Sequence, residues 1–200
     1  IVKDENGFIY WPAFTLNSIG EMCPGEGYLI KLNNFSMLEY PSEAGRYSFS
    51  VLNSEKTTHY KQAINTGNNM IIGFPLTAWS LIPQIGDEIA AYNESDRLIG
   101  STVFNGENTA LTVWGDDLIT DKKDGLSIGE KVSFKLWDSH QQVEYDLIVT
   151  KWGEGSEHYS IDGISVASYI SVEQDYMQEN KIIKTTDVLG REINDNSRNI

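Results

Sequence analysis

Four aspartates lie close together in one short stretch of the chain, and Gly115 and Gly125 flank them. The four are Asp116, Asp117, Asp121 and Asp124. Carboxylates on a turn suit Ca²⁺, which takes about six to eight hard oxygen ligands. The spacing does not match an EF-hand, and Lys122 and Lys123 can neutralise part of the charge. Two alternatives remain, a site for Ca²⁺ or another hard cation and a solvated acidic turn with aspartate caps. The sequence favours the turn.

Tryptophans form the second set of residues that could bind a ligand. The chain has five, and Trp114 and Trp137 each end an expected strand beside a turn residue. An aromatic face can stack on a sugar ring while the indole N–H keeps a polar partner. At the rim of a sheet these two side chains would form a carbohydrate platform, whereas inside it they would fill the core. We expect most of the five to be core residues, and Trp114 and Trp137 are the candidates for ligand binding.

No arrangement of residues typical of a catalytic site is found. A Gly-x-Ser-x-Gly motif is absent. Asp87 and Glu88 are adjacent, so on a strand they point to opposite faces and cannot flank one glycosidic bond. The histidines lack the spacing of zinc ligands; they are His59, His140 and His158. We predict that the chain is not an enzyme.

The composition narrows the classes of partner that the chain is expected to bind. The 200 residues carry a net charge of −14, and 40% of them are hydrophobic, which is enough for a folded core. Nucleic-acid binding depends on cations that neutralise phosphates, so we expect no nucleic acid partner. Apolar runs are only a few residues long, so we expect no membrane insertion. The single cysteine excludes an intrachain disulfide.

The spacing of turn residues along the chain is typical of a β protein. Short runs rich in Val, Ile, Tyr, Phe and Trp alternate with Gly, Asn and Asp turns. The expected strands span residues 8–11, 27–32, 46–52, 70–74, 88–92, 98–104, 110–114, 131–137 and 144–150. In the run 131–137, apolar and polar residues alternate, which predicts one face on a core and the other in water.

A hairpin is predicted over residues 159–166. Apolar and polar residues alternate on both sides of Asp162-Gly163. A two-residue type I′ turn needs positive φ at both loop positions, which this dipeptide adopts at low cost.

The C-terminal stretch, residues 181–191, reads Lys-Ile-Ile-Lys-Thr-Thr-Asp-Val-Leu-Gly-Arg. Asp187, Gly190 and Arg191 match the Asp-x-x-Gly-Arg start of the sorting domain carried by cargo of the bacterial type IX secretion system. The stretch therefore resembles the opening of such a domain. Members of that family continue to a second strand pair and a Lys-rich end, and this chain stops before both.

Two further stretches resemble surface proteins of the Bacteroidota. Residues 9–14, together with the turn at 24–28, are similar to a segment that recurs there. The second resemblance, to a β module found just upstream of type IX sorting domains, covers residues 86–92, 98–101, 111–117 and 134–138. That module has no assigned catalytic activity.

The resemblance implies export of the parent protein through the type IX machinery. In the family, the sorting domain is removed after export and the protein is often attached to surface polysaccharide. By analogy, cleavage would fall in or near residues 172–180. The expected location is secreted or anchored on the outer cell surface.

We therefore expect an all-β protein, a β-sandwich of jelly-roll type with a small N-terminal β-hairpin element. The expected parts are a hairpin-rich element (1–44), a β-sandwich module (45–171), an acidic linker (172–180) and a truncated start of a sorting domain (181–200). The expected function is a non-catalytic spacer or adhesion unit upstream of the sorting signal. The alternative is a carbohydrate-binding module that serves an upstream enzyme.

Overall fold

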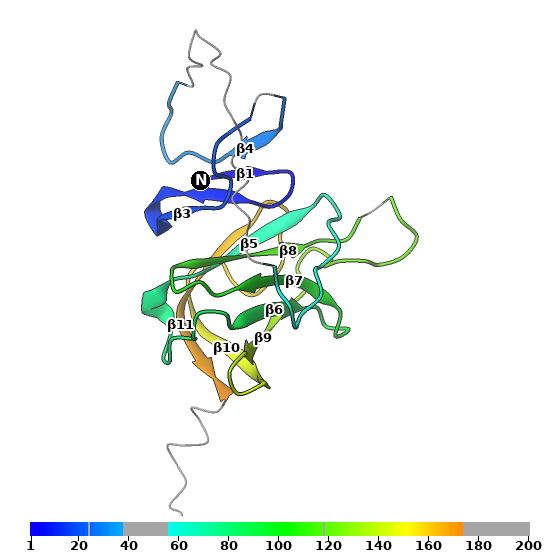
Figure 1. Ribbon diagram of the computed structural model, residues 1–200. Helices are drawn as coiled ribbons and strands as arrows, with labels where there is room; N and C mark the ends of the chain where they lie inside the picture. Colours follow the sequence, from blue (N-terminus) through cyan, green and yellow to red (C-terminus); the bar gives the residue numbers. More distant parts are fainter. Residues whose placement is uncertain (24, 38–55, 118, 174–200) are drawn as a thin grey trace, which may run out of the picture.

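The computed structural model describes residues 1–23, 25–37, 56–117 and 119–173, which form two β-sheets (Figure 1). The smaller sheet has four short strands: β1 (Val2–Asp4), β2 (Ile9–Trp11), β3 (Leu16–Asn17) and β4 (Tyr28–Ile30). The larger sheet has seven: β5 (Asn69–Phe74), β6 (Glu88–Tyr92), β7 (Leu98–Val103), β8 (Thr109–Trp114), β9 (Ser133–Asp138), β10 (Val143–Glu154) and β11 (Ile164–Val172). Two short 3-10 helices follow β2 and β5, namely η1 (Pro12–Phe14) and η2 (Leu76–Ala78). The all-β prediction is confirmed.

The larger sheet curls until its outermost strands meet. Its strands lie in the order β7-β6-β9-β10-β11-β5-β8. All neighbours are antiparallel except β11 and β5, which are parallel. Gly100 of β7 packs so closely on β8 that a side chain there would collide with the carbonyl oxygen of Thr112. The curled sheet therefore encloses a core.

Apolar side chains from every strand of the larger sheet fill this core. Strand β9 illustrates how alternate residues face the core. Phe134 and Leu136 are buried in the core, while Lys135 and Trp137 alternate with them on the outer face. Burial of one such apolar side chain contributes about 1.5–3 kcal/mol. The predicted alternation in this run is confirmed.

The smaller sheet packs on the outside of the larger one, beside β5 and β8 (Figure 1). Ile9 and Trp11 of β2 contact Ile71 of β5 and Val166 of β11. Gly73 of β5 lies under the Trp11 ring, where an added Cβ would approach the ring to 3.4 Å. The N-terminal element is thus docked on the main sheet through a second, smaller apolar cluster.

The sequence located most strands correctly. Eight of the nine predicted strands fall in described residues, and each overlaps an observed strand. The ninth, over 46–52, lies outside the described residues. The short strands β1 and β3 were not predicted. The expected jelly-roll arrangement has antiparallel strands throughout, and the parallel pair β11–β5 departs from it.

The predicted hairpin over 159–166 is wrong. Gly163 N–H donates to the Ser160 carbonyl (2.9 Å), and of the two loop residues only Asp162 has positive φ, at 58°. The chain before the turn pairs elsewhere, because Tyr159 N–H donates to the Glu130 carbonyl (2.9 Å). After the turn, β11 pairs with β5 and β10. Alternation was present on both sides of the turn, but the two arms have different partners.

Candidate functional site

The acidic loop is tied together by its own carboxylates. Asp116 Oδ1 accepts the backbone N–H groups of Asp124 (2.7 Å) and Gly125 (3.4 Å). These hydrogen bonds, the one from Asp124 first, hold the pKa of Asp116 below its ordinary value. Asp124 in turn accepts the N–H of Asp117 (3.2 Å). The aspartates thus cap backbone donors, as in the turn alternative.

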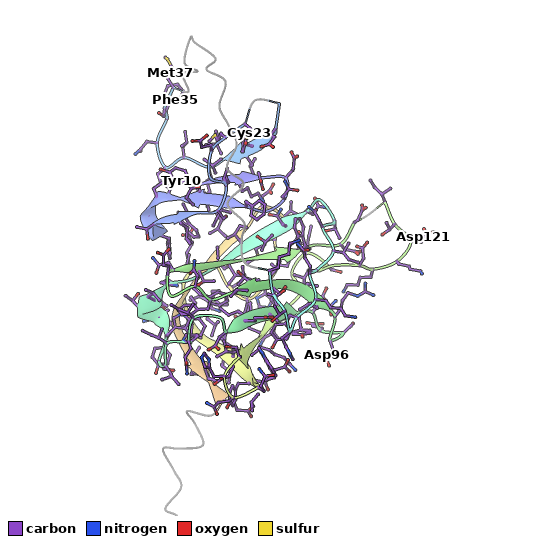
Figure 2. All side chains as sticks on the ribbon, viewed as in Figure 1. Tyr10, Cys23, Phe35, Met37, Asp96 and Asp121 are labelled. Atoms are coloured by element: carbon purple, nitrogen blue, oxygen red, sulfur yellow. The ribbon has the colours of Figure 1, made fainter. Side chains whose placement is uncertain are left out.

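The four aspartates do not converge on one point. Figure 2 shows Asp121 near the end of a loop that projects from the larger sheet. Among the described residues, one group of three His, Cys, Asp or Glu side chains has ligand atoms within 4.8 Å of one another, and it lies elsewhere. Calcium binding by this loop stays an untested alternative, and the described residues of the loop supply no converging ligand set for it.

The group that does converge is Asp87, Asp138 and His140, at the turn between β9 and β10. Asp87 accepts hydrogen bonds from the N–H of Gln84 (2.8 Å) and from the N–H and hydroxyl of Ser139 (both 2.9 Å). Asp138 accepts the N–H groups of His140 (2.9 Å) and the residue after it. Both carboxylates therefore shape the turn.

The two candidate tryptophans lie in different surroundings. Trp114 is 7% exposed at the end of β8. Trp137 lies on the outer face of β9, and the ring of His59 stacks on it at 3.6 Å between centroids and 3° between planes. The structure does not bring the two indoles together as one platform, and His59 covers a face of Trp137.

One row of side chains crosses the outer face of three neighbouring strands. Glu88 of β6 and Glu144 of β10 are both register partners of Trp137 in the central strand β9. A stretch that we name the crossing segment (residues 57–64) lies beside this row, since its Thr58, His59 and Tyr60 contact all three side chains. This row could not be predicted from the sequence, because it depends on which strands are neighbours in the sheet.

Glu88 holds the crossing segment in place. Its carboxylate accepts the N–H groups of Thr58 (2.6 Å), His59 (3.0 Å) and Tyr60 (3.0 Å), and also the Thr58 hydroxyl (2.9 Å). Glu88 is only 2% exposed. Burial alone would raise the pKa of Glu88, but the hydrogen bonds outweigh it and the pKa is lowered. A buried, ionised carboxylate therefore fixes the backbone of this segment.

Glu144 forms the second polar centre of the row. It accepts the Tyr60 hydroxyl at 2.9 Å and the Lys135 ammonium at 2.7 Å, and His59 Nε2 lies 3.9 Å away. Burial alone would raise the pKa of Glu144, but these partners lower it. Burial first, and then the hydrogen bond to Glu144, raise the pKa of Tyr60. The pair thus consists of a carboxylate and a neutral phenol.

An open cleft of about 460 Å³ lies along the crossing segment. Its lining side chains come from the segment, from the β6–β7 hairpin, from the ends of β8 and β10 and from the acidic loop between β8 and β9. Aromatic residues of the lining include Tyr60, Tyr92 and Trp114, and the Tyr60 and Tyr92 rings meet edge to face at 6.4 Å. The charged residues of the lining are Lys61, Arg97, Asp124 and Glu144. Trp114, one of the two tryptophans predicted to bind a ligand, is therefore part of the cleft.

The cleft combines apolar rings with hydrogen-bonding groups, which suits binding. General acid catalysis by a carboxyl group needs a raised pKa. The pKa of Glu144 in the cleft is lowered, as is that of Glu88 beside it. Neither of these two carboxylates is therefore a protonated acid that could donate a proton to a leaving group.

The fold and the site define an all-β module with an aromatic cleft on the outer face of a curled sheet. Comparisons with protein-family models, curated proteins and solved structures gave no match for this chain. The described residues contain no helix long and apolar enough to cross a membrane. The sorting-motif residues Asp187, Gly190 and Arg191 lie outside the described residues.

Proposed function

We propose that this chain is a non-catalytic module of a secreted or cell-surface protein, which acts as an adhesion unit by binding a saccharide in the cleft. One observation carries the proposal, the open cleft of about 460 Å³ beside the crossing segment. Ligand sites typically have volumes of about 300–1,000 Å³, so this cleft can hold one or two sugar rings.

The lining suits a sugar. A sugar ring offers C–H faces to aromatic rings and hydroxyl groups to polar side chains. Tyr92 is half-buried and lies beside Leu98, its register partner across the hairpin. Gln62 and Lys61 supply polar ends from the crossing segment. Both kinds of contact are therefore present in one place.

The cleft is built in advance of any ligand. The buried carboxylate of Glu88 fixes the backbone of residues 58–60, and Tyr60 is fixed again through its bond to Glu144. Ser101 of β7 donates its hydroxyl to the Lys61 carbonyl at 3.3 Å. A binding wall that is already ordered loses less conformational entropy when a ligand binds.

Export is the second part of the proposal. It rests on the resemblance of the C-terminal stretch to a type IX sorting domain, through Asp187, Gly190 and Arg191. The partners would then be the type IX machinery and, after export, surface polysaccharide. Protease treatment of intact cells followed by mass spectrometry should release peptides of the parent protein. Recovery of the protein from the cytoplasm alone contradicts export.

A glycan array tests the binding part. The wild-type chain should retain a defined set of glycans, and Tyr92→Ala should lose them. Tyr169→Ala is the matched control, because Tyr169 is 48% exposed on β11 and does not line the cleft. If the wild-type chain retains no glycan, the binding proposal is wrong and only the spacer role remains.

A carbohydrate-binding module that serves an upstream enzyme would give the same array result. The parent reading frame separates the two roles. A catalytic domain upstream of residue 1 favours the module that serves an enzyme, whereas repeated β modules favour adhesion.

A further inference from the structure

We propose that the cleft selects saccharides that carry an anionic substituent, with Arg97 and Lys61 as the groups that recognise it. This inference rests on the proposed function, because it names the chemical class of ligand for the same cleft. It is notable for a chain whose net charge is −14, since the chain as a whole repels anions.

The cations of the cleft have no partner among the described residues. Within residues 1–23, 25–37, 56–117 and 119–173, the side chains of Lys61 and Arg97 form no hydrogen bond or ion pair. By contrast, several other lysines of these ranges are paired with carboxylates; they are Lys3, Lys31, Lys123, Lys131 and Lys135. Arg97 is the one arginine in these ranges. Its five side-chain N–H donors are therefore not used by any residue in these ranges.

The carboxylates of the lining already have partners. Glu144 accepts from Tyr60 and Lys135, one on each oxygen. Asp124 accepts from the N–H of Asp117 and from the Thr120 hydroxyl. The acidic groups of the cleft thus have hydrogen-bond partners within the part of the chain that the structure describes, whereas its basic groups have none there.

The hairpin between β6 and β7 places Arg97 beside the aromatic part of the cleft. Asn93 N–H donates to the Arg97 carbonyl at 3.1 Å, and the Asn93 side chain accepts the Arg97 N–H at 2.9 Å. Asn93 is buried, so the turn that carries Arg97 has a fixed base. Asp96, at the tip of the same turn, marks this corner of the sheet in Figure 2. A sugar ring against Tyr92 would therefore have its substituents within the region of Arg97.

The chemistry favours an anion on a sugar. A guanidinium group binds a carboxylate or a sulfate with two parallel N–H···O bonds, and Lys61 adds a point charge. A free inorganic anion would leave the Tyr92 and Leu98 surface unused. The ligand expected is therefore a uronate-type or a sulfated saccharide.

Equilibrium binding with matched saccharides tests the inference. The probes are trisaccharides of a uronic acid (galacturonate, mannuronate and glucuronate), their neutral methyl esters and a sulfated trisaccharide. We expect an acidic form to bind, and its methyl ester to bind at least about tenfold more weakly. Arg97→Gln and Lys61→Gln should each remove most of this preference. Lys151→Gln, a change of the same charge outside the cleft, should leave it unchanged.

The outcomes separate this inference from the proposed function. Binding of the sulfated probe alone, lost in Arg97→Gln, supports an anionic ligand and assigns it as a sulfate. Equal binding of acidic and neutral forms, unaffected by Arg97→Gln, overturns the inference and leaves saccharide binding in place. Failure of every acidic and neutral glycan to bind overturns both. An unchanged melting temperature of Arg97→Gln confirms that a loss of binding is not a loss of folding.

Discussion

The imidazole of His59 lies flat on the indole of Trp137, with ring centroids 3.6 Å apart and 3° between the planes. His59 comes from the crossing segment and Trp137 from the middle of the row on β6, β9 and β10. The contact therefore joins the wall of the cleft to the sheet beneath it. It also means that Trp137 works as a support for the cleft, while Trp114 is a part of its lining.

The two tryptophans are expected to differ in what they contribute to folding. Trp114→Ala removes a side chain that is 7% exposed and should lower the free energy of unfolding by about 3–5 kcal/mol. Trp137→Ala removes a partly buried ring and one stacking contact, with an expected loss of about 1–2 kcal/mol. Urea denaturation followed by circular dichroism measures both. Equal losses would contradict the different roles of the two residues.

Glu88→Gln should detach the crossing segment from the sheet. The amide keeps one acceptor oxygen for three backbone N–H groups, so we expect a loss of about 1–3 kcal/mol in the free energy of unfolding at pH 7. Saccharide binding should weaken as well, because Tyr60 loses its position. Glu94→Gln, an exposed change on the β6–β7 turn, is the control and should have little effect.

The same bonds predict a pH dependence. The pKa of Glu88 is lower in the folded chain than its ordinary value of about 4.3, so folding favours the ionised form. Its contribution to stability is present above that ordinary value and is lost as the pH falls through the folded pKa. In denaturation curves between pH 7 and pH 3, the stability gap between wild type and Glu88→Gln should therefore narrow below about pH 4. A constant gap contradicts the ionised state of Glu88.

The strands could be predicted from the sequence, whereas the cleft could not. A short apolar run between turn residues is a local pattern, and it placed β6 over the predicted range 88–92 without error. The order of the strands depends on contacts between distant segments, so the sequence could not show that Glu88, Trp137 and Glu144 form one row. One hint was present: Glu88 is the single charged residue of an otherwise apolar strand, and a buried charge needs a partner. The hairpin prediction failed for the same reason, because each arm pairs with a strand or loop from another part of the sequence.

The stability of the chain should depend on Asp116 of the acidic loop and should not change with calcium. Asp116→Ala leaves the N–H groups of Asp124 and Gly125 without their acceptor, with an expected loss of about 1 kcal/mol. Asp121→Ala, at the exposed end of the loop, should change stability by less than about 0.5 kcal/mol. Addition of EDTA should leave the melting temperature unchanged. A fall of several degrees, restored by Ca²⁺, would instead establish a structural calcium site, because a ligand bound to the folded state stabilises it.

Closure of the larger sheet should depend on Gly100. An alanine there would push its Cβ into the carbonyl oxygen of Thr112, so β7 and β8 would have to separate. Overpacking of this kind costs about 1–3 kcal/mol. Gly27→Ala is the matched control, since its added Cβ would meet only the carboxylate of Glu5 at an ordinary 3.6 Å. Both variants can be compared by thermal unfolding, and hydrogen exchange should show faster exchange in β7 and β8 of Gly100→Ala alone. Equal melting temperatures for the two variants would mean that the outermost strands of the sheet, β7 and β8, do not pack against each other in solution.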